Sequence, residues 1–181
     1  MKKLLFVCMM GISLLIGCNN YKNFQEAVTA LNKKYQSVAE HIFTQKKESW
    51  EESSQREQQK YDRQFQKLAK KWEENTENNE YHISIYKQVQ QLHINLCTEK
   101  VYTPYQEEIE ERLAIYIPWA VSIPRSYYGG QMARQLGAEV GVDQLALQKK
   151  YEKVASKYGC VIPEEFKTAL SNGVSNVFAF F

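Results

Sequence analysis

The feature that most limits the fold is a long stretch without helix breakers. Residues 18–103 contain neither glycine nor proline, which is 86 positions in a row. The stretch is rich in Gln, Glu, Lys, Leu and Ala, all of which favour helix. The whole chain has only 8 Gly and 4 Pro, the residues that punctuate the turns of β-rich and disordered chains. The sequence therefore predicts an all-α protein.

The first part of this stretch carries a heptad pattern. Apolar residues alternate at spacings of four and three: Phe24, Val28, Leu31, Tyr35, Val38 and Ile42. This spacing is typical of a coiled-coil seam. The seam then changes phase, and Trp50 and Tyr61 are eleven residues apart, a step that suits a nearly straight helix contact. We expect one helix from about Asn20 to Asn75, with a break at Ser53–Ser54 as the alternative.

Charge dominates the second part of this predicted helix. Residues 44–80 hold 17 charged side chains among 37, and both signs are interspersed. One interpretation is a solvated helix with a thin apolar stripe. The other is an exposed rod that binds a partner. Either way, residues 18–80 are expected to form a long, charged, amphipathic arm.

Further helices are expected in residues 81–181, packed with the arm. A second helix is predicted over Tyr81–Lys100, and a third begins with Thr103 as N-cap and Pro104 at its first position. Short connections favour antiparallel packing. The predicted fold is thus a long N-terminal amphipathic helix folded against a small helical bundle.

The last third contains small residues and stop signals. Small side chains recur every four residues at Gly129, Ala133, Gly137 and Gly141, a stripe that would let another helix of the same chain approach closely. Asp143 is expected to cap a helix that Gly159 ends. A short last helix is expected over residues 163–172. The tail, residues 174–181, is expected to pack on the core, with a docking peptide as the alternative.

The first residues have the pattern of an export signal. Met1-Lys2-Lys3 is positively charged, residues 4–16 are apolar, and Gly17 precedes Cys18. A charged start, a short apolar run and a small residue before the cleavage point are typical of a secretory signal peptide. A membrane-spanning helix would need about 20 apolar residues.

The stretch Leu15-Ile16-Gly17-Cys18 resembles the lipobox of bacterial lipoproteins. The resemblance implies that residues 1–17 are a signal peptide, that cleavage occurs before Cys18, and that the Cys18 thiol and the new amino terminus carry acyl chains, palmitate among them. Several acyl chains would hold the protein stably on a membrane. In a Gram-negative host, Asn19 is similar to the default signal for outer-membrane sorting. The alternatives are an ordinary secretory leader and an uncleaved anchor.

The expected lipoprotein processing leaves two cysteines available to pair. Cys8 would leave with the leader and Cys18 would carry lipid, so Cys97 and Cys160 remain. Exported chains meet an oxidising environment in which two thiols commonly pair, so we expect a Cys97–Cys160 disulfide. A bond between residues 97 and 160 would raise the free energy of unfolding by about 4 kcal/mol, because it lowers the entropy of the unfolded chain. Two buried thiols, or a reactive nucleophile, are the alternatives.

The histidines give no metal site in the sequence. His93 and Cys97 are four residues apart on one helix face, but His82 would lie about 16 Å from His93 along a straight helix. Zinc needs three or four convergent ligands, so one ion could not join these histidines. We expect boundary histidines that flank an apolar stripe, and neither a metal ion nor a cofactor.

Aromatic residues gather around the prolines of the second half. Tyr127, Tyr128 and Trp119 are the candidate partner surface, because aromatic side chains concentrate at binding hot spots. Filling of the core is the alternative. The acidic run Glu107–Glu111 is interpreted as favourable charge in the first turn of a helix.

The expected function is non-enzymatic. A formal charge of +2 gives no basic face for nucleic acid, and the sequence has no glycine-rich phosphate loop or serine-nucleophile motif. We expect a lipid-anchored structural or protein-binding component of the cell envelope, on the outer membrane if the host is Gram-negative. The alternatives are an exclusion, immunity or host-interaction lipoprotein, a membrane-bridging lipoprotein, and a periplasmic enzyme that uses Cys160 or a histidine.

Overall fold

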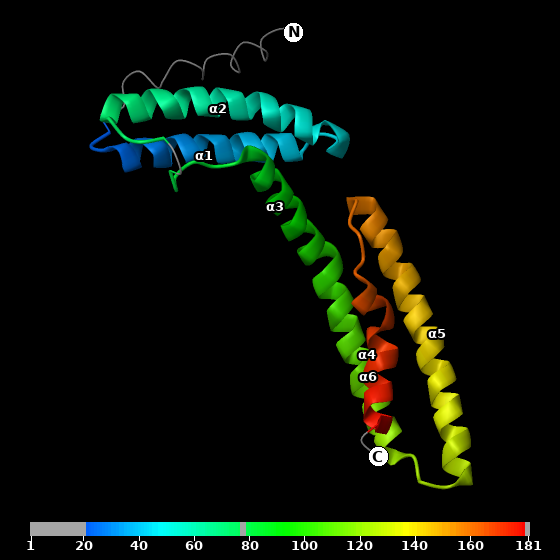
Figure 1. The fold of residues 1–181 in the computed structure, drawn as a ribbon. Coiled ribbons are helices and arrows are strands. Elements are labelled where there is room, and N and C mark those ends of the chain that lie inside the picture. Colours follow the sequence, from blue (N-terminus) through cyan, green and yellow to red (C-terminus); the bar gives the residue numbers. More distant parts are fainter. Residues whose placement is uncertain (1–20, 77–78, 180–181) are drawn as a thin grey trace, which may run out of the picture. The chain divides into compact units, whose positions relative to one another are not determined.

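The computed structural model describes residues 21–76 and 79–179 (Figure 1). The described residues form helices and no strand, so the predicted all-α fold class is confirmed. The chain divides into two compact units that meet between Gln90 and Gln91, inside helix α3 (Ile85–Cys97). We describe unit 1 and unit 2 separately. That residues 18–80 act as an arm stays a prediction.

Unit 1 begins with α1 (Phe24–Phe43). Asn23 caps this helix, because its side-chain oxygen accepts a hydrogen bond from the Glu26 backbone N–H at 2.8 Å. The heptad residues form the buried face, as predicted, with Val38 partly buried. They pack against α2 (Trp50–Trp72), which carries Tyr61 and Phe65 into the same core.

The single helix predicted over residues 20–75 is instead a helical hairpin. The chain reverses after Phe43 through a short 3-10 turn, η2 (Lys47–Ser49), and α2 then packs against α1. Local hydrogen bonds compete with the helix here: the Thr44 hydroxyl donates to the His41 carbonyl at 2.7 Å, and the Trp50 indole donates to the Gln45 carbonyl at 3.2 Å. The phase change of the apolar seam after Ile42 therefore marks the start of a new helix.

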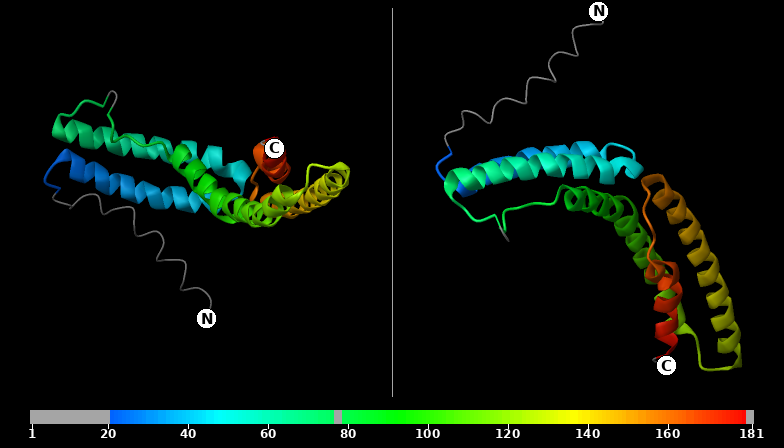
Figure 2. Two further views of the ribbon diagram at one scale, coloured as in Figure 1. Left: turned by 90° about the horizontal axis from the view of Figure 1, so that it is seen from below. Right: turned by 45° about the horizontal axis from the view of Figure 1, so that its top comes forward.

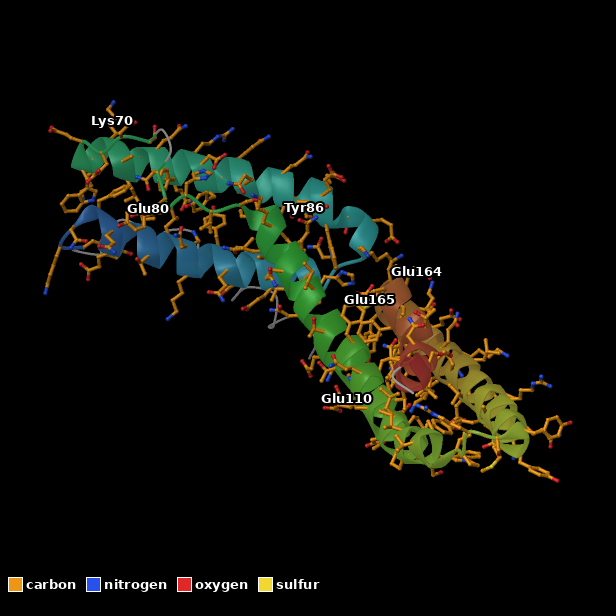
Figure 3. The ribbon with its side chains drawn as sticks, turned by 60° about the horizontal axis from the view of Figure 1, so that its bottom comes forward. Lys70, Glu80, Tyr86, Glu110, Glu164 and Glu165 are labelled. Atoms are coloured by element: carbon orange, nitrogen blue, oxygen red, sulfur yellow. A yellow bond between two sulfur atoms is a disulfide. The ribbon has the colours of Figure 1, made fainter. Side chains whose placement is uncertain are left out.

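The predicted alternative break lies in the wrong place. Ser53 and Ser54 are buried within α2 rather than at its end, and the Ser53 hydroxyl donates to the Gln45 side chain at 2.9 Å. Helix α2 ends at Trp72, because Glu73 adopts a left-handed conformation with φ of 54°. Figure 3 shows Lys70 and Glu80 at the surface of this unit, where both are exposed.

Polar side chains fasten the segment before α3 to the hairpin. The Gln58 amide donates to the Ile83 carbonyl at 3.0 Å and accepts from the Ile85 N–H at 2.9 Å, so it bonds as a neighbouring peptide group would. The Asn32 amide donates to the Tyr81 carbonyl at 2.9 Å, and the Ile83 N–H donates to the Tyr61 hydroxyl at 3.3 Å. These bonds place Ile85 in the core of unit 1.

Helix α3 continues without interruption into the next two elements. A π-helical turn, η3 (Thr98–Tyr102), joins it to α4 (Thr103–Ser122), so Thr103 is not the predicted N-cap and has helical backbone angles. Pro104 has no N–H to donate and crowds the carbonyl one turn earlier. The π turn before Pro104 accommodates this within a continuous helical run. Pro118 lies inside α4, and the helix ends four residues later.

Unit 2 is a three-helix bundle formed by α4, α5 (Tyr127–Tyr158) and α6 (Glu164–Ala179). Helix α5 runs antiparallel to the other two (Figure 1, Figure 2). Tyr105 of α4 stacks on Tyr151 of α5, with ring centroids 4.4 Å apart. The exposed carboxylates Glu164 and Glu165 lie in the first turn of α6 (Figure 3), where they suit the helix dipole.

Helix α5 begins earlier than predicted. Its N-cap is Ser126, whose hydroxyl oxygen accepts from the Gly129 N–H at 3.2 Å. The predicted cap, Asp143, lies in the middle of the helix, where it pairs with Arg112 at 2.9 Å. Gly159 ends the helix, as predicted, with φ of 66°.

The small-residue stripe does not make the close contact that was predicted. A Cβ added at Gly137 or Gly141 would meet nothing within 4 Å in the described residues beyond its own helix. The close approach occurs at Gly173 of α6, where an added Cβ would lie 2.6 Å from a methyl carbon of Leu113. The helix predicted over residues 163–172 therefore continues past Gly173, and Val174 packs in the core.

A buried amide joins α5 to α6. Gln144 is 6% exposed, and its side-chain oxygen accepts from the Leu170 N–H at 2.9 Å and the Ser171 N–H at 3.3 Å. Its nitrogen donates to the Phe166 carbonyl at 3.3 Å. Three backbone groups of α6 therefore depend on one side chain from the neighbouring helix.

Candidate functional site

The predicted lipid-attachment residue, Cys18, lies outside the described residues, so lipid attachment stays a prediction. Across the described parts of the chain, every helix is too short or too polar to cross a membrane.

Cys97 and Cys160 lie at disulfide distance, as predicted. Their sulfur atoms are 2.11 Å apart and their Cα atoms 5.8 Å apart. Cys97 is the last residue of α3, and Cys160 directly follows the left-handed cap Gly159. This cap turns the chain so that the Cys160 N–H bonds to the Ala155 carbonyl at 2.9 Å. The end of α5 thereby carries the Cys160 sulfur to α3.

His93 is the third member of this cluster. Its Nε2 atom lies 3.6 Å from the Cys97 sulfur and 3.0 Å from the Tyr158 carbonyl oxygen. His93, Cys97 and Cys160 each offer one atom that could bind a metal ion, and these three atoms all lie within 4.8 Å of one another. We call these three residues the His-Cys-Cys cluster. The sequence indicated the spacing of His93 and Cys97 on one helix face and a Cys97–Cys160 pair, but we did not predict that the two combine into one group of three ligands.

The other histidines lie apart from this cluster along the chain and have structural contacts. His82 pairs with Asp62 at 2.8 Å and packs edge-on against Tyr61 and Phe65 in unit 1. His41 is exposed in the last turn of α1. The prediction of boundary histidines concerned His82 and His93, and His82 lies just before α3, as expected.

The cluster has a buried and an accessible side. Cys97 is 3% exposed, whereas Cys160 and His93 are half-buried. The Tyr102 hydroxyl, from the π turn, donates to the Val161 carbonyl at 2.8 Å, so the chain after Cys160 is held against η3. A small solute can therefore reach two of the three side chains while the third stays fixed in the helix.

The candidate partner surface divides into two parts. Tyr127 and Tyr128 are 80% and 74% exposed at the start of α5, and their rings meet edge to face at 5.9 Å between centroids. Trp119 instead is partly buried and packs against the core of unit 2 beside Tyr116. The tyrosine pair, Tyr127 and Tyr128, is thus the accessible part of the predicted surface.

Tyr116 forms a buried polar contact between α4 and the middle of α5. Its hydroxyl donates to the Asp143 carboxylate at 2.7 Å, and Asp143 also pairs with Arg112. Burial, followed by the hydrogen bond to Asp143 and the charge of that carboxylate, raises the pKa of Tyr116 to about 12. The contact links α4 to α5. In the acidic run, Glu108 pairs with Lys150, which also joins these helices.

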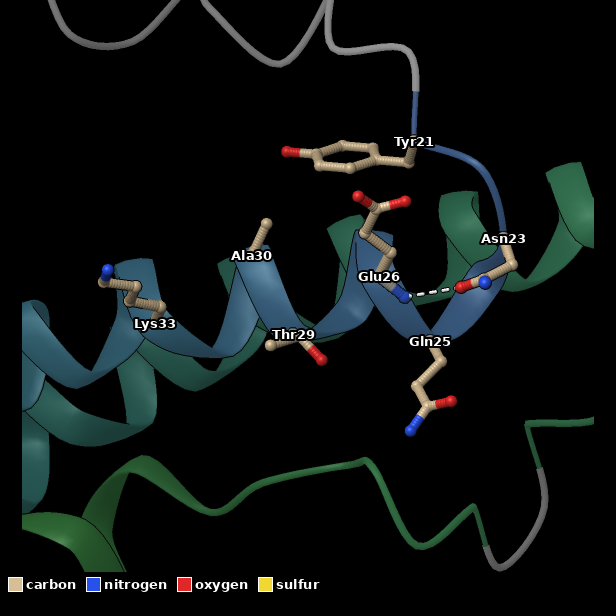
Figure 4. A pocket seen from close by; sticks show the side chains of 7 residues that line it. All are labelled: Tyr21, Asn23, Gln25, Glu26, Thr29, Ala30 and Lys33. Atoms are coloured by element: carbon tan, nitrogen blue, oxygen red, sulfur yellow. Dashed lines mark hydrogen bonds between the residues drawn. The ribbon is translucent and has the colours of Figure 1, made fainter.

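A shallow, open pocket lies at the start of α1 (Figure 4). Its lining comes from the first turns of this helix and the residues before it: Tyr21, Asn23, Gln25, Glu26, Thr29, Ala30 and Lys33. The Asn23 side chain is engaged as the helix cap, and the Glu26 carboxylate accepts from the Lys22 N–H at 2.7 Å. Its polar groups therefore serve the helix start.

Comparisons of the chain with protein-family models, with curated proteins and with solved structures give no match.

Proposed function

We propose that this protein is a lipid-anchored component of a bacterial cell envelope that binds another envelope protein and carries out no catalysis. The observation that carries the proposal is the stretch Leu15-Ile16-Gly17-Cys18 after a positively charged, apolar N-terminus. Acyl chains on Cys18 would hold the protein on the membrane, and the helical units would project from it.

The Cys97–Cys160 pair supports an exported location. Structural disulfides persist in oxidising compartments and are rare in the bacterial cytosol. The two sulfur atoms are at bonding distance, and Cys97 is buried. A structural disulfide in unit 2 is what an exported lipoprotein of this size would use to strengthen a small core.

The tyrosine pair supports a binding role. Tyr127 and Tyr128 are large, exposed and adjacent, and tyrosine is enriched at protein–protein hot spots. Val121, 52% exposed, lies at the end of α4, and Met132, 37% exposed, lies on α5 one turn after the pair. The amides of Gln58, partly buried, and Gln144, buried, by contrast bond to backbone groups of neighbouring segments.

Lipid attachment is tested by the intact mass of the protein from native membranes. We expect a chain that begins at Cys18 and carries acyl adducts, and membrane partitioning that is lost in the Cys18→Ala variant. Cys8→Ala is the matched control, because it changes a leader cysteine outside the lipobox and should leave processing unchanged. A full-length chain without an adduct would refute the proposed anchor.

Partner binding is tested by photo-crosslinking in intact cells. A photoreactive phenylalanine replaces Tyr127 in one variant and Tyr86, 39% exposed on α3, in the control. We expect a discrete adduct with an envelope protein from position 127 and none from position 86. Equal adducts from both positions would show that exposure alone causes the crosslink.

A further inference from the structure

The His-Cys-Cys cluster has the composition of a zinc site whose two sulfur atoms are joined. Zn²⁺ binds thiolate sulfur at about 2.3 Å and imidazole nitrogen at about 2.0 Å. In a tetrahedral site these bond lengths place a sulfur and a nitrogen ligand about 3.6 Å apart. The Cys97 sulfur and the His93 Nε2 atom are 3.6 Å apart.

We propose that the reduced form of this protein binds one Zn²⁺ ion through His93, Cys97 and Cys160, and that the disulfide and the ion exclude one another. Nitrogen and sulfur donors of this kind select Zn²⁺ over Mg²⁺ or Ca²⁺. Three protein ligands leave the fourth position to water. The proposal does not depend on lipid attachment.

The redox step requires a dithiol reductant. Two electrons and two protons pass from the reductant to the disulfide, so that each sulfur becomes a thiol and the reductant becomes a disulfide. Zn²⁺ then displaces one proton from each of Cys97 and Cys160 and forms two zinc–sulfur bonds and one zinc–nitrogen bond. Oxidation by a disulfide oxidant removes two electrons, restores the Cys97–Cys160 bond and releases the ion.

The fold suits this exchange because only one ligand needs to move. His93 and Cys97 are one turn apart on α3, which fixes their separation. Cys160 lies in the connection between α5 and α6, where hydrogen bonds hold its backbone, so rotation of its side chain would carry the sulfur away from Cys97. The two sulfur atoms must separate from 2.11 Å to about 3.8 Å, the spacing of two thiolates on one tetrahedral zinc ion.

Zinc binding also exchanges one contact of His93. Its Nε2–H now donates to the Tyr158 carbonyl oxygen at 3.0 Å. When Nε2 binds the ion this contact is lost, and the imidazole carries its proton on Nδ1 instead. One neutral hydrogen bond is weak compared with a zinc–imidazole bond at a site that contains two thiolates. The Tyr158 carbonyl then faces the accessible side of the cluster, where solvent can bond to it.

The test uses the full chain with Cys8→Ser and Cys18→Ser, so that the only thiols are Cys97 and Cys160. Oxidised and dithiol-reduced protein are each incubated with Co²⁺ as a spectroscopic probe for Zn²⁺ and are then desalted. We expect one Co²⁺ per reduced chain, with thiolate-to-cobalt charge-transfer absorption and the visible bands of tetrahedral cobalt. We expect none for the oxidised chain.

Two histidine variants show whether His93 is a ligand. His93→Gln should form the disulfide normally, whereas the reduced form should bind Zn²⁺ about 100-fold more weakly in competition with a chromophoric chelator. His41→Gln, on the exposed end of α1, is the matched control and should bind as the parent does. Helical circular dichroism of each reduced chain is recorded with and without Zn²⁺.

Several results would overturn the proposal. These are no Co²⁺ retained by the reduced chain, equal retention by the oxidised chain, or equal affinity of the two histidine variants. A reduced chain that loses its helical signal and does not regain it with Zn²⁺ would also overturn it, because the ligands would then not converge.

Discussion

Replacing Gly137 and Gly141 by alanine should stabilise unit 2. Both residues lie inside α5, and an added Cβ at either would have open space around it. Glycine in a helix interior costs about 1 kcal/mol relative to alanine, because it has more backbone entropy to lose. Neither substitution removes a contact. We therefore expect the double variant to gain about 2 kcal/mol in the free energy of unfolding of unit 2.

The assay must report on α5 rather than on the whole chain, because a protein with two units need not unfold in one step. Hydrogen exchange of the α5 amides, followed by mass spectrometry of peptides from this helix, isolates the effect. Exchange through opening of unit 2 should slow by about 30-fold for a gain of 2 kcal/mol. The midpoint of thermal denaturation of unit 2 should rise by about 8 to 16 °C, because each kcal/mol is worth about 4 to 8 °C in a unit of this size.

Gly129→Ala is the matched control, and its effect should have the opposite sign. Its Cβ would lie 1.7 Å from the Pro124 carbonyl oxygen, which is backbone and cannot rotate away. The turn before α5 must shift, at a cost of about 1–3 kcal/mol. If the Gly137/Gly141 double variant instead loses stability, the face of α5 that holds them is covered in the folded protein, and the reasoning fails.

Three further predictions concern unit 2. Gln144→Leu removes three hydrogen bonds to backbone groups of α6 and should lower stability by about 1–3 kcal/mol in urea denaturation. Gln148→Leu, whose side chain bonds to Glu152 at the surface, should change stability by less than about 0.5 kcal/mol. The pKa of Tyr116 is higher in the folded state than in the unfolded state. Neutral Tyr116 therefore adds at most about 3 kcal/mol to the free energy of unfolding below pH 10, and this stabilisation is lost as the pH rises toward 12. A pH titration of stability should show this loss in the parent and less of it in Tyr116→Phe, and equal losses would contradict the assignment. Reducing Cys97–Cys160 should lower the free energy of unfolding of unit 2 by about 4 kcal/mol, as measured by urea denaturation with and without a dithiol. An unchanged free energy would show that the bond does not restrict the unfolded chain as assumed.

The helical faces could be predicted because they depend on local spacing. Phe24, Val28 and Leu31 are buried as the heptad pattern indicates, and Gly159 ends α5 because only glycine adopts its backbone angles easily. Breaks without glycine or proline were missed. The reversal after Phe43 depends on hydrogen bonds from Thr44 and other polar residues, which helices also tolerate.

Features that depend on tertiary placement could not be predicted from spacing alone. Asp143 has the chemistry of a helix cap, but Arg112 and Tyr116 of a neighbouring helix provide its partners. Gly137 and Gly141, which suggested a close helix contact, face open space, whereas Gly173, just beyond the predicted last helix, makes such a contact.

The candidate site could be predicted only in part, because one of its contacts depends on tertiary placement. The Cys97–Cys160 pair followed from counting thiols in an exported chain. The spacing of His93 and Cys97 was also visible in the sequence, whereas the approach of Cys160 to both side chains depends on where α5 ends relative to α3.

The bond between Cys97 and Cys160 closes a covalent ring that includes η3, α4 and α5 and leaves α6 outside it. The exposed connection at Pro124–Ser126 lies within this ring. A protease that cuts there produces two polypeptides that remain linked through sulfur, and they separate on a gel only after reduction. A molecule nicked at that point would therefore keep its C-terminal helix attached to its N-terminal end.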